Sequence, residues 1–149
     1  MTKVEEFKSE KQRFKHLMTE RPNSDIQVAF DLDGVLASNN NGDYENAAPL
    51  KEGIEAINKV YDLGYDVTIY TARFGKRSPG FQYQMGYELT LTWLRKNGVK
   101  FHRLIMGKPA YDIVADDKAV RIDINNPVAG WQEFWRQLDL VHNKNQYGQ

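Results

Sequence analysis

The sequence has no cysteine among its 149 residues, which excludes disulfide bonds, thiolate metal sites and cysteine nucleophiles. Its longest apolar runs are a few residues, far short of the ~20 that a membrane-spanning helix needs. Neither charge is in excess, because 20 Lys and Arg residues balance 20 Asp and Glu residues. This balance argues against a surface that attracts nucleic acid or an anionic membrane as a whole, although it is compatible with a local basic patch.

The length and the N-terminal sequence set the expected organisation. The start, MTKVEEFKSEKQRFKHL, is too charged for a secretory signal, so we expect a cytoplasmic protein. A chain of this length has room for a single domain with one core. We expect a helical extension over 1–24, a motif-bearing core over 25–125, and a C-terminal helix and tail over 126–149. The sequence leaves the oligomeric state open, and a homo-oligomer is one of the alternatives.

Apolar patterning predicts an alternation of strands and helices. The expected strands are short apolar runs at 26–31, 65–70, 101–106, 113–115 and 120–122. Amphipathic helices follow the first and second of these, and each ends at a glycine, Gly64 or Gly98. This order implies right-handed crossovers. We therefore expect an α/β, three-layer, Rossmann-like fold with a central parallel sheet of about five strands and no separate cap domain.

Polar residues follow four successive strands of the predicted sheet. They are Asp31 and Asp33 after the first strand, Thr71 at the end of the second, Lys108 after the third, and Asp116 and Asp117 after the fourth. Singly, each has an ordinary structural explanation as a turn, a cap or a surface charge. In parallel sheets, however, ligands bind beyond the carboxyl ends of the strands. The occurrence of polar residues after all four strands therefore predicts a functional site at the carboxyl edge of the sheet.

The residues at these strand ends resemble a known family. In order, DLDG, IYTAR, GKP and ADD match the four motifs of the haloacid dehalogenase superfamily over about residues 26–124. The stretches DYENAAP (43–49) and DDKA (116–119) are similar to those of small cap-less phosphatases, often associated with capsule or surface-polysaccharide biosynthesis. The connections after the first and second strands are too short for a cap domain, so we expect an open site.

The resemblance implies a phosphomonoester hydrolase that works through an aspartyl-phosphate. Asp31 would be the nucleophile, and Asp33 would protonate the leaving oxygen and then activate water. An Asp at this second position favours phosphoryl transfer over dehalogenation. Thr71 would donate a hydrogen bond to a phosphoryl oxygen, and Lys108 would place positive charge on the transferring group. Hydrolysis and transfer to another acceptor use the same nucleophile, and the sequence leaves that choice open.

The resemblance also implies a magnesium ion, a hard cation that prefers oxygen ligands. Its ligands would be Asp31, the backbone carbonyl of Asp33, and Asp116. Asp117 would support the site without binding the metal directly, although the sequence does not decide which of Asp116 and Asp117 is the ligand.

The substrate is predicted to be a small phosphate ester, a phosphorylated sugar or a related metabolite. Three cations next to Thr71, Arg73, Lys76 and Arg77, form either a solvated loop or a clamp for a second anionic group. The alternatives are a nucleic-acid 3′-end phosphatase or nucleotidase, and a catalytically silent protein that binds without turnover. No membrane partner is expected.

Overall fold

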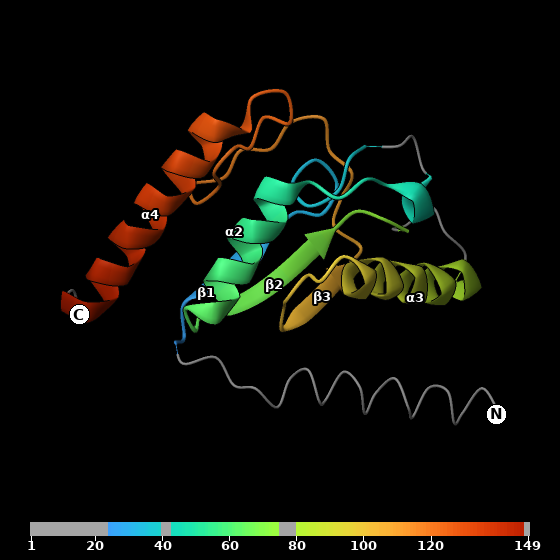
Figure 1. Ribbon diagram of the computed structural model, residues 1–149, viewed down its shortest axis with the longest axis horizontal. Coiled ribbons are helices and arrows are strands. Elements are labelled where there is room, and N and C mark those ends of the chain that lie inside the picture. The colour runs from blue at the N-terminus through green and yellow to red at the C-terminus, as the bar shows by residue number, and fades with distance from the viewer. Residues whose placement is uncertain (1–23, 40–42, 75–79, 148–149) are drawn as a thin grey trace.

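The structure is a computed structural model and describes residues 24–39, 43–74 and 80–147. The helix expected over 1–24 falls almost wholly outside these residues. Strands and helices alternate along the described chain (Figure 1). In chain order they are β1 (Gln27–Phe30), the 3-10 turn η1 (Tyr44–Asn46), α2 (Lys51–Asp62), β2 (Asp66–Thr71), α3 (Gly80–Lys96), β3 (Arg103–Met106) and α4 (Pro127–Tyr147).

The three strands form one parallel sheet in the order β1–β2–β3. Val28 of β1 pairs with Val67 of β2, and Ile69 of β2 pairs with Leu104 of β3. Helix α2 connects β1 to β2, and α3 connects β2 to β3. This mixed α/β arrangement is compatible with a Rossmann-like fold, as the sequence predicts for its first three strands and two helices.

The sheet of about five strands is not confirmed. Within the described residues, the segments 113–115 and 120–122 form no strand, and Ile113 is 89% exposed. A segment of only three residues carries too little periodicity to separate a strand from a loop. Here the whole of 109–119 is exposed, and no neighbouring strand accepts its backbone hydrogen bonds.

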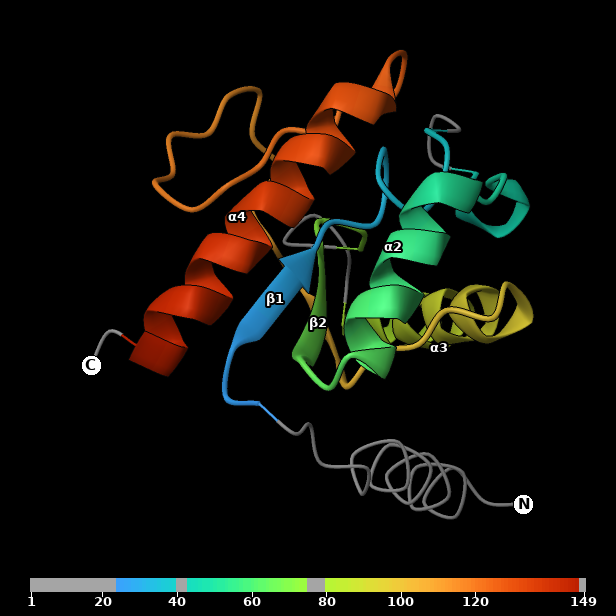
Figure 2. The ribbon, with the colours of Figure 1, turned by 60° about the vertical axis from the view of Figure 1, so that its left-hand side comes forward.

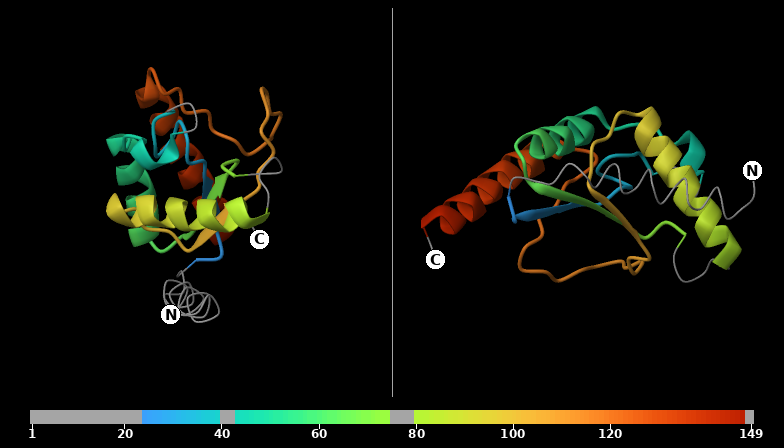
Figure 3. Two further views of the ribbon diagram at one scale, coloured as in Figure 1. Left: turned by 90° about the vertical axis from the view of Figure 1, so that its right-hand side faces the viewer. Right: turned by 90° about the horizontal axis from the view of Figure 1, so that it is seen from below.

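One face of the sheet carries the core. The side chains that point to this face are buried in all three strands: Val28, Phe30, Val67, Ile69, Leu104 and Met106. Helices α2 and α3 lie on the same side of the sheet, and the segment between β3 and α4 runs on the other side (Figure 3, right). On that other face Tyr70 and Ile105 are exposed. The described helices therefore bury one face only.

Helix α4 packs beside α2 next to β1 (Figure 2). The ring of Phe30 lies 5.5 Å from the ring of Phe134 and 6.4 Å from that of Trp131, between centroids. Trp131 and Leu138 are buried, so α4 packs an apolar face against the core. None of the helices in the part of the chain that the structure describes has the length and apolar character of a membrane span.

Candidate active site

The carboxyl ends of the three strands meet at one edge of the sheet (Figure 1). Asp31 and Asp33 directly follow β1, Thr71 is the last residue of β2, and Lys108 comes two residues after β3. The backbone N–H of Lys108 donates to the carbonyl oxygen of Thr71 at 3.1 Å, which extends the β2–β3 pairing past the strand ends. The structure thus brings four of the predicted site residues to the same edge.

A tight turn after β1 presents the two aspartates. Leu32 is fully buried, and its carbonyl oxygen accepts hydrogen bonds from the N–H groups of Leu36 and Ala37 at 2.8 and 3.0 Å. Gly34 has φ +89°, a conformation that other residues rarely adopt. The buried Leu32 anchors the turn, so the flanking Asp31 and Asp33 are held at the surface of the sheet edge.

Asp31 forms an ion pair with Lys108. The Nζ atom of Lys108 lies 3.2 Å from Oδ2 of Asp31, and the side chains are 12% and 40% exposed, respectively. The other oxygen, Oδ1, accepts a hydrogen bond from the Leu32 N–H at 2.7 Å. The Asp31 carboxylate is therefore oriented from two sides, while a large part of its surface stays open to a ligand.

The surroundings of Lys108 keep it charged. Burial alone would lower its pKa, but a hydrogen bond with Tyr111 and the charge and hydrogen bond of Asp31 outweigh that effect, so the pKa is raised. The ammonium also lies 4.8 Å from the ring centre of Tyr111 and 5.8 Å from that of Tyr70. Lys108 is therefore a stable cation beside the Asp31 carboxylate over the physiological pH range.

Thr71 is fully buried and forms part of the frame of the site. Its Oγ1 accepts a hydrogen bond from the backbone N–H of Arg73 at 3.1 Å. This bond uses an acceptor lone pair of the hydroxyl, and its proton remains a donor. Because Thr71 has no exposed surface in this arrangement, its donation to a phosphoryl oxygen stays a prediction.

Arg73 is buried against Asp33. Its guanidinium is 1% exposed and donates three hydrogen bonds to the carboxylate of Asp33: Nε to Oδ1 at 3.1 Å, Nε to Oδ2 at 2.9 Å, and an Nη atom to Oδ1 at 2.6 Å. The sequence predicts Arg73 as a substrate-binding cation, yet in the structure its charge faces the protein. Lys76 and Arg77 lie outside the described residues.

Asp116 and Asp117 lie in the exposed segment between β3 and α4. Oδ1 of Asp116 accepts a hydrogen bond from the backbone N–H of Lys118 at 2.7 Å, as in a local turn. Across the described residues, no group of three or more His, Cys, Asp or Glu side chains could hold a metal ion. The predicted magnesium set has only two carboxylate side chains, Asp31 and Asp116, with the backbone carbonyl of Asp33, so it is not a group of this kind and stays a prediction.

Aromatic residues surround the two cations of the site, and the motif argument assigns none of them a role. Tyr44 and Trp93 face the guanidinium of Arg73, while Tyr70 and Tyr111 flank Lys108. Tyr44 lies within the DYENAAP stretch, and Tyr111 follows Lys108 by three residues. Of these rings, only Tyr111 lies close in sequence to the cation that it contacts, so sequence spacing gives no signal for the other three.

Comparisons with known proteins bear on the fold. A scan of protein-family models and a search of curated proteins both found no match. A crystal structure of a target protein from Vibrio cholerae is similar, with a TM-score of 0.62 at 27% identity, covering 78% of this chain and 98% of that one. The chain therefore shares its overall arrangement with that protein.

Two further solved structures overlap less well. The Pnkp1/Rnl/Hen1 complex gives a TM-score of 0.44 at 20% identity, with 64% of this chain and 32% of that chain covered. The D,D-heptose 1,7-bisphosphate phosphatase from B. bronchiseptica, complexed with magnesium and phosphate, gives 0.42 at 13% identity, with 76% and 64% covered. Both scores are too low to support an argument about this chain.

Proposed function

We propose that the chain is a phosphomonoester hydrolase of the haloacid dehalogenase type, with Asp31 as the residue that is transiently phosphorylated. The observation that carries this proposal is the pairing of Asp31 with Lys108 at the carboxyl edge of a parallel sheet, 3.2 Å apart. A half-exposed carboxylate beside a stable cation suits attack on a phosphate ester, because the cation offsets repulsion between the two anions. The four sequence motifs support the same assignment.

The reaction has two balanced steps. In the first, an oxygen of Asp31 bonds to phosphorus as the ester P–O bond breaks, and Asp33 gives a proton to the leaving oxygen. In the second, water attacks phosphorus, the bond to Asp31 breaks, and Asp33 takes a proton from the water. Lys108 would stabilise charge on the phosphoryl oxygens, and Thr71 would donate a hydrogen bond to one of them.

The two steps use only Asp31, Asp33, Lys108 and Thr71, because the predicted ligand Asp116 lies in an exposed segment between β3 and α4. The magnesium requirement stays a prediction of the sequence. Chelation tests it directly: the prediction requires that phosphate release fall when divalent cations are removed and return when Mg²⁺ is added.

We propose a phosphorylated sugar or related metabolite as the substrate. The connections 31–50 and 72–79 are too short for a separate domain, so the proposed site is open at the sheet edge. An open site suits a metabolite and a nucleic-acid end alike, and of the cations 73–77, which would favour the nucleic-acid alternative, Arg73 is buried against Asp33. No observation on the described residues favours that alternative, and it enters the test below as a possible outcome.

The test is phosphate release from 4-nitrophenyl phosphate and from a panel of sugar phosphates, nucleotides and 3′-phosphorylated oligonucleotides. Asp31→Asn should abolish release, because an amide cannot form the acyl phosphate. The matched control is Asp62→Asn, which changes an exposed aspartate paired with Lys100 away from the site. Release that survives D31N, or no release by folded protein on any substrate, contradicts the proposal. The preferred substrate decides between metabolite and nucleic acid.

A further inference from the structure

The contact between Arg73 and Asp33 has the geometry of an orienting clamp. A guanidinium is a planar fork of donors that stays charged, so a bidentate contact fixes both the distance and the plane of the carboxylate. Two of the three hydrogen bonds end on Oδ1 and one ends on Oδ2. The Asp33 side chain is 25% exposed, so the carboxylate is held from the protein side and still reaches solvent.

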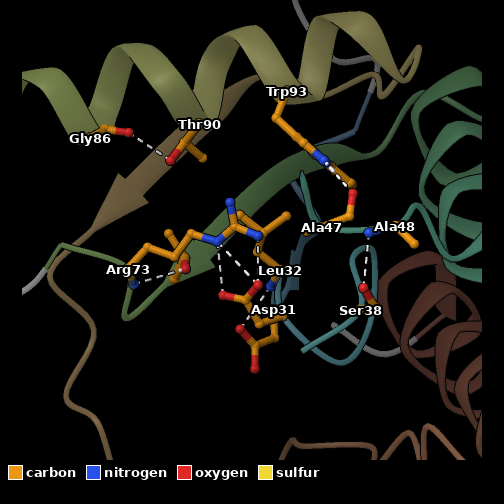
Figure 4. Close-up of polar contacts among 11 residues, drawn as sticks. Asp31, Leu32, Ser38, Ala47, Ala48, Arg73, Gly86, Thr90 and Trp93 are labelled. Atoms are coloured by element: carbon orange, nitrogen blue, oxygen red, sulfur yellow. Dashed lines mark hydrogen bonds and ion pairs between the residues drawn. The ribbon is translucent and has the colours of Figure 1, made fainter. Parts of the chain in front are cut away.

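The guanidinium is itself fixed by aromatic rings. Its central carbon lies 4.4 Å from the ring centre of Tyr44, in η1, and 5.9 Å from that of Trp93, in α3. Trp93 is anchored because its Nε1–H donates to the carbonyl oxygen of Ala47 at 2.9 Å (Figure 4). Tyr44 packs edge-on against Phe74 with ring centres 5.1 Å apart. Arg73 is thus positioned by two elements besides its own.

We infer that Arg73 is a positioning residue that aims Asp33 at the leaving oxygen of the substrate, with Tyr44 and Trp93 fixing its guanidinium. The inference rests on the proposed function, since it assigns Arg73 a part in the proton transfer by Asp33. A substrate-binding role would need an accessible guanidinium, whereas this one is buried and fully turned toward the protein. A misplaced proton donor can cost about 100-fold in rate, so a clamp on Asp33 has a measurable purpose.

The leaving group distinguishes positioning from other roles. An alkyl phosphate has a poor leaving group that needs the proton from Asp33, whereas 4-nitrophenolate leaves with little help. Arg73→Lys keeps the charge and removes the bidentate fork. We expect R73K to lower kcat on a simple alkyl phosphate about tenfold more than on 4-nitrophenyl phosphate, with little change in KM for either substrate.

Three further variants make the test specific. Arg103→Lys makes the same exchange in the Arg103–Asp66 ion pair, away from the site, and should not discriminate between the substrates. In an Asp33→Asn background, R73K should cause little additional loss, because Arg73 acts through Asp33. Tyr44→Leu removes a stacking ring and should give the same selective loss in weaker form. If R73K does not fold, Y44L decides the question.

The outcomes separate the inference from the proposed function. A selective loss on the alkyl phosphate supports the positioning role. An equal loss on both substrates, or a raised KM with kcat unchanged, overturns it while wild-type activity still upholds the phosphatase. Absence of phosphate release by the folded wild type on every substrate overturns the proposed function, and the inference falls with it.

Discussion

Asp31 and Lys108 form an ion pair that spans the end of the middle strand: Asp31 follows β1 and Lys108 follows β3, the two outer strands of the sheet, and their charged atoms are 3.2 Å apart. The strand between them is β2, which ends at Thr71. An anion that contacts both charged groups would therefore lie beyond the end of β2, close to the Thr71 hydroxyl. In the proposed reaction, this relationship would place one carboxylate and one ammonium on a single phosphoryl group.

Replacing Lys108 by Met should lower phosphate release by about 100- to 1,000-fold, the range seen when one electrostatic contact to a transition state is lost. The effect should fall mainly on kcat, because the charge of Lys108 acts most strongly on the developing charge of the transferring group. Steady-state kinetics on 4-nitrophenyl phosphate measure it. Lys100→Met removes an exposed lysine paired with Asp62 and is the control. Equal losses in the two variants would contradict the assignment.

Gly53→Ala should destabilise the fold by about 1–3 kcal/mol, as overpacking of a well-filled contact does. A Cβ atom at Gly53 would come 1.8 Å from the carbonyl oxygen of Val35, so either α2 or the turn after β1 must move. Chemical denaturation measures the change in the free energy of unfolding. Glu52→Ala, at the exposed neighbouring position of the same helix, is the control and should be nearly neutral. A G53A protein as stable as wild type would show that the close approach is relieved at little cost.

Trp93→Phe should cost about 1–3 kcal/mol, since it leaves the buried carbonyl oxygen of Ala47 without the indole N–H. The ring face toward Arg73 is largely kept, so activity should fall less than stability. Urea unfolding gives the first quantity and initial rates give the second. Trp135→Phe, at a partly buried tryptophan of α4, is the matched variant and should be better tolerated. If Trp135→Phe destabilised the protein more than Trp93→Phe, the result would argue against the hydrogen bond to Ala47.

Glu133 should titrate at unusually low pH. Hydrogen bonds from Arg136 and Gln137 lower its pKa from an ordinary 4.5 to about 2. Because the pKa of Glu133 is lower in the folded state than in the unfolded state, its charged carboxylate stabilises the fold at pH values above the unfolded-state pKa. This contribution is lost as the pH falls through about 2. NMR titration of the Glu133 carboxyl carbon measures the pKa directly. Glu133→Gln should lack the corresponding loss of stability between pH 4.5 and 2, and a Glu133 midpoint near 4.5 would contradict the expectation.

The sequence predicts the part of the fold that rests on long periodic segments. The helices α2 and α3 each have enough turns to show an apolar stripe, and their flanking strands are buried runs. Gly64 and Gly98 end those helices with positive φ values of 95° and 68°, as expected for left-handed caps. The strand ends follow from this order, so Asp31, Asp33, Thr71 and Lys108 come to the same edge.

What the sequence does not predict depends on contacts between distant residues. The burial of Arg73 requires Asp33, Tyr44 and Trp93 to converge from three separate elements, and none of these pairings follows from spacing along the chain. An arginine near a predicted site is usually exposed, so sequence reasoning places its charge toward the substrate. Ile113 and Val114 favour strands by composition, but a strand also needs a hydrogen-bonded neighbour, which sequence patterning does not supply.

The hydrogen bond from the Lys108 N–H to the Thr71 carbonyl oxygen separates two regions of the chain. Lys108 is tied to the sheet, whereas every residue of 109–119 is exposed. Within that segment Tyr111 contacts the ammonium, so changes beyond Tyr111 can leave the ammonium in place beside Asp31. Protein engineering can exploit this boundary: a peptide tag or recognition loop grafted at the exposed Ile113 would extend the rim of the molecule and leave Tyr111 beside the charge pair.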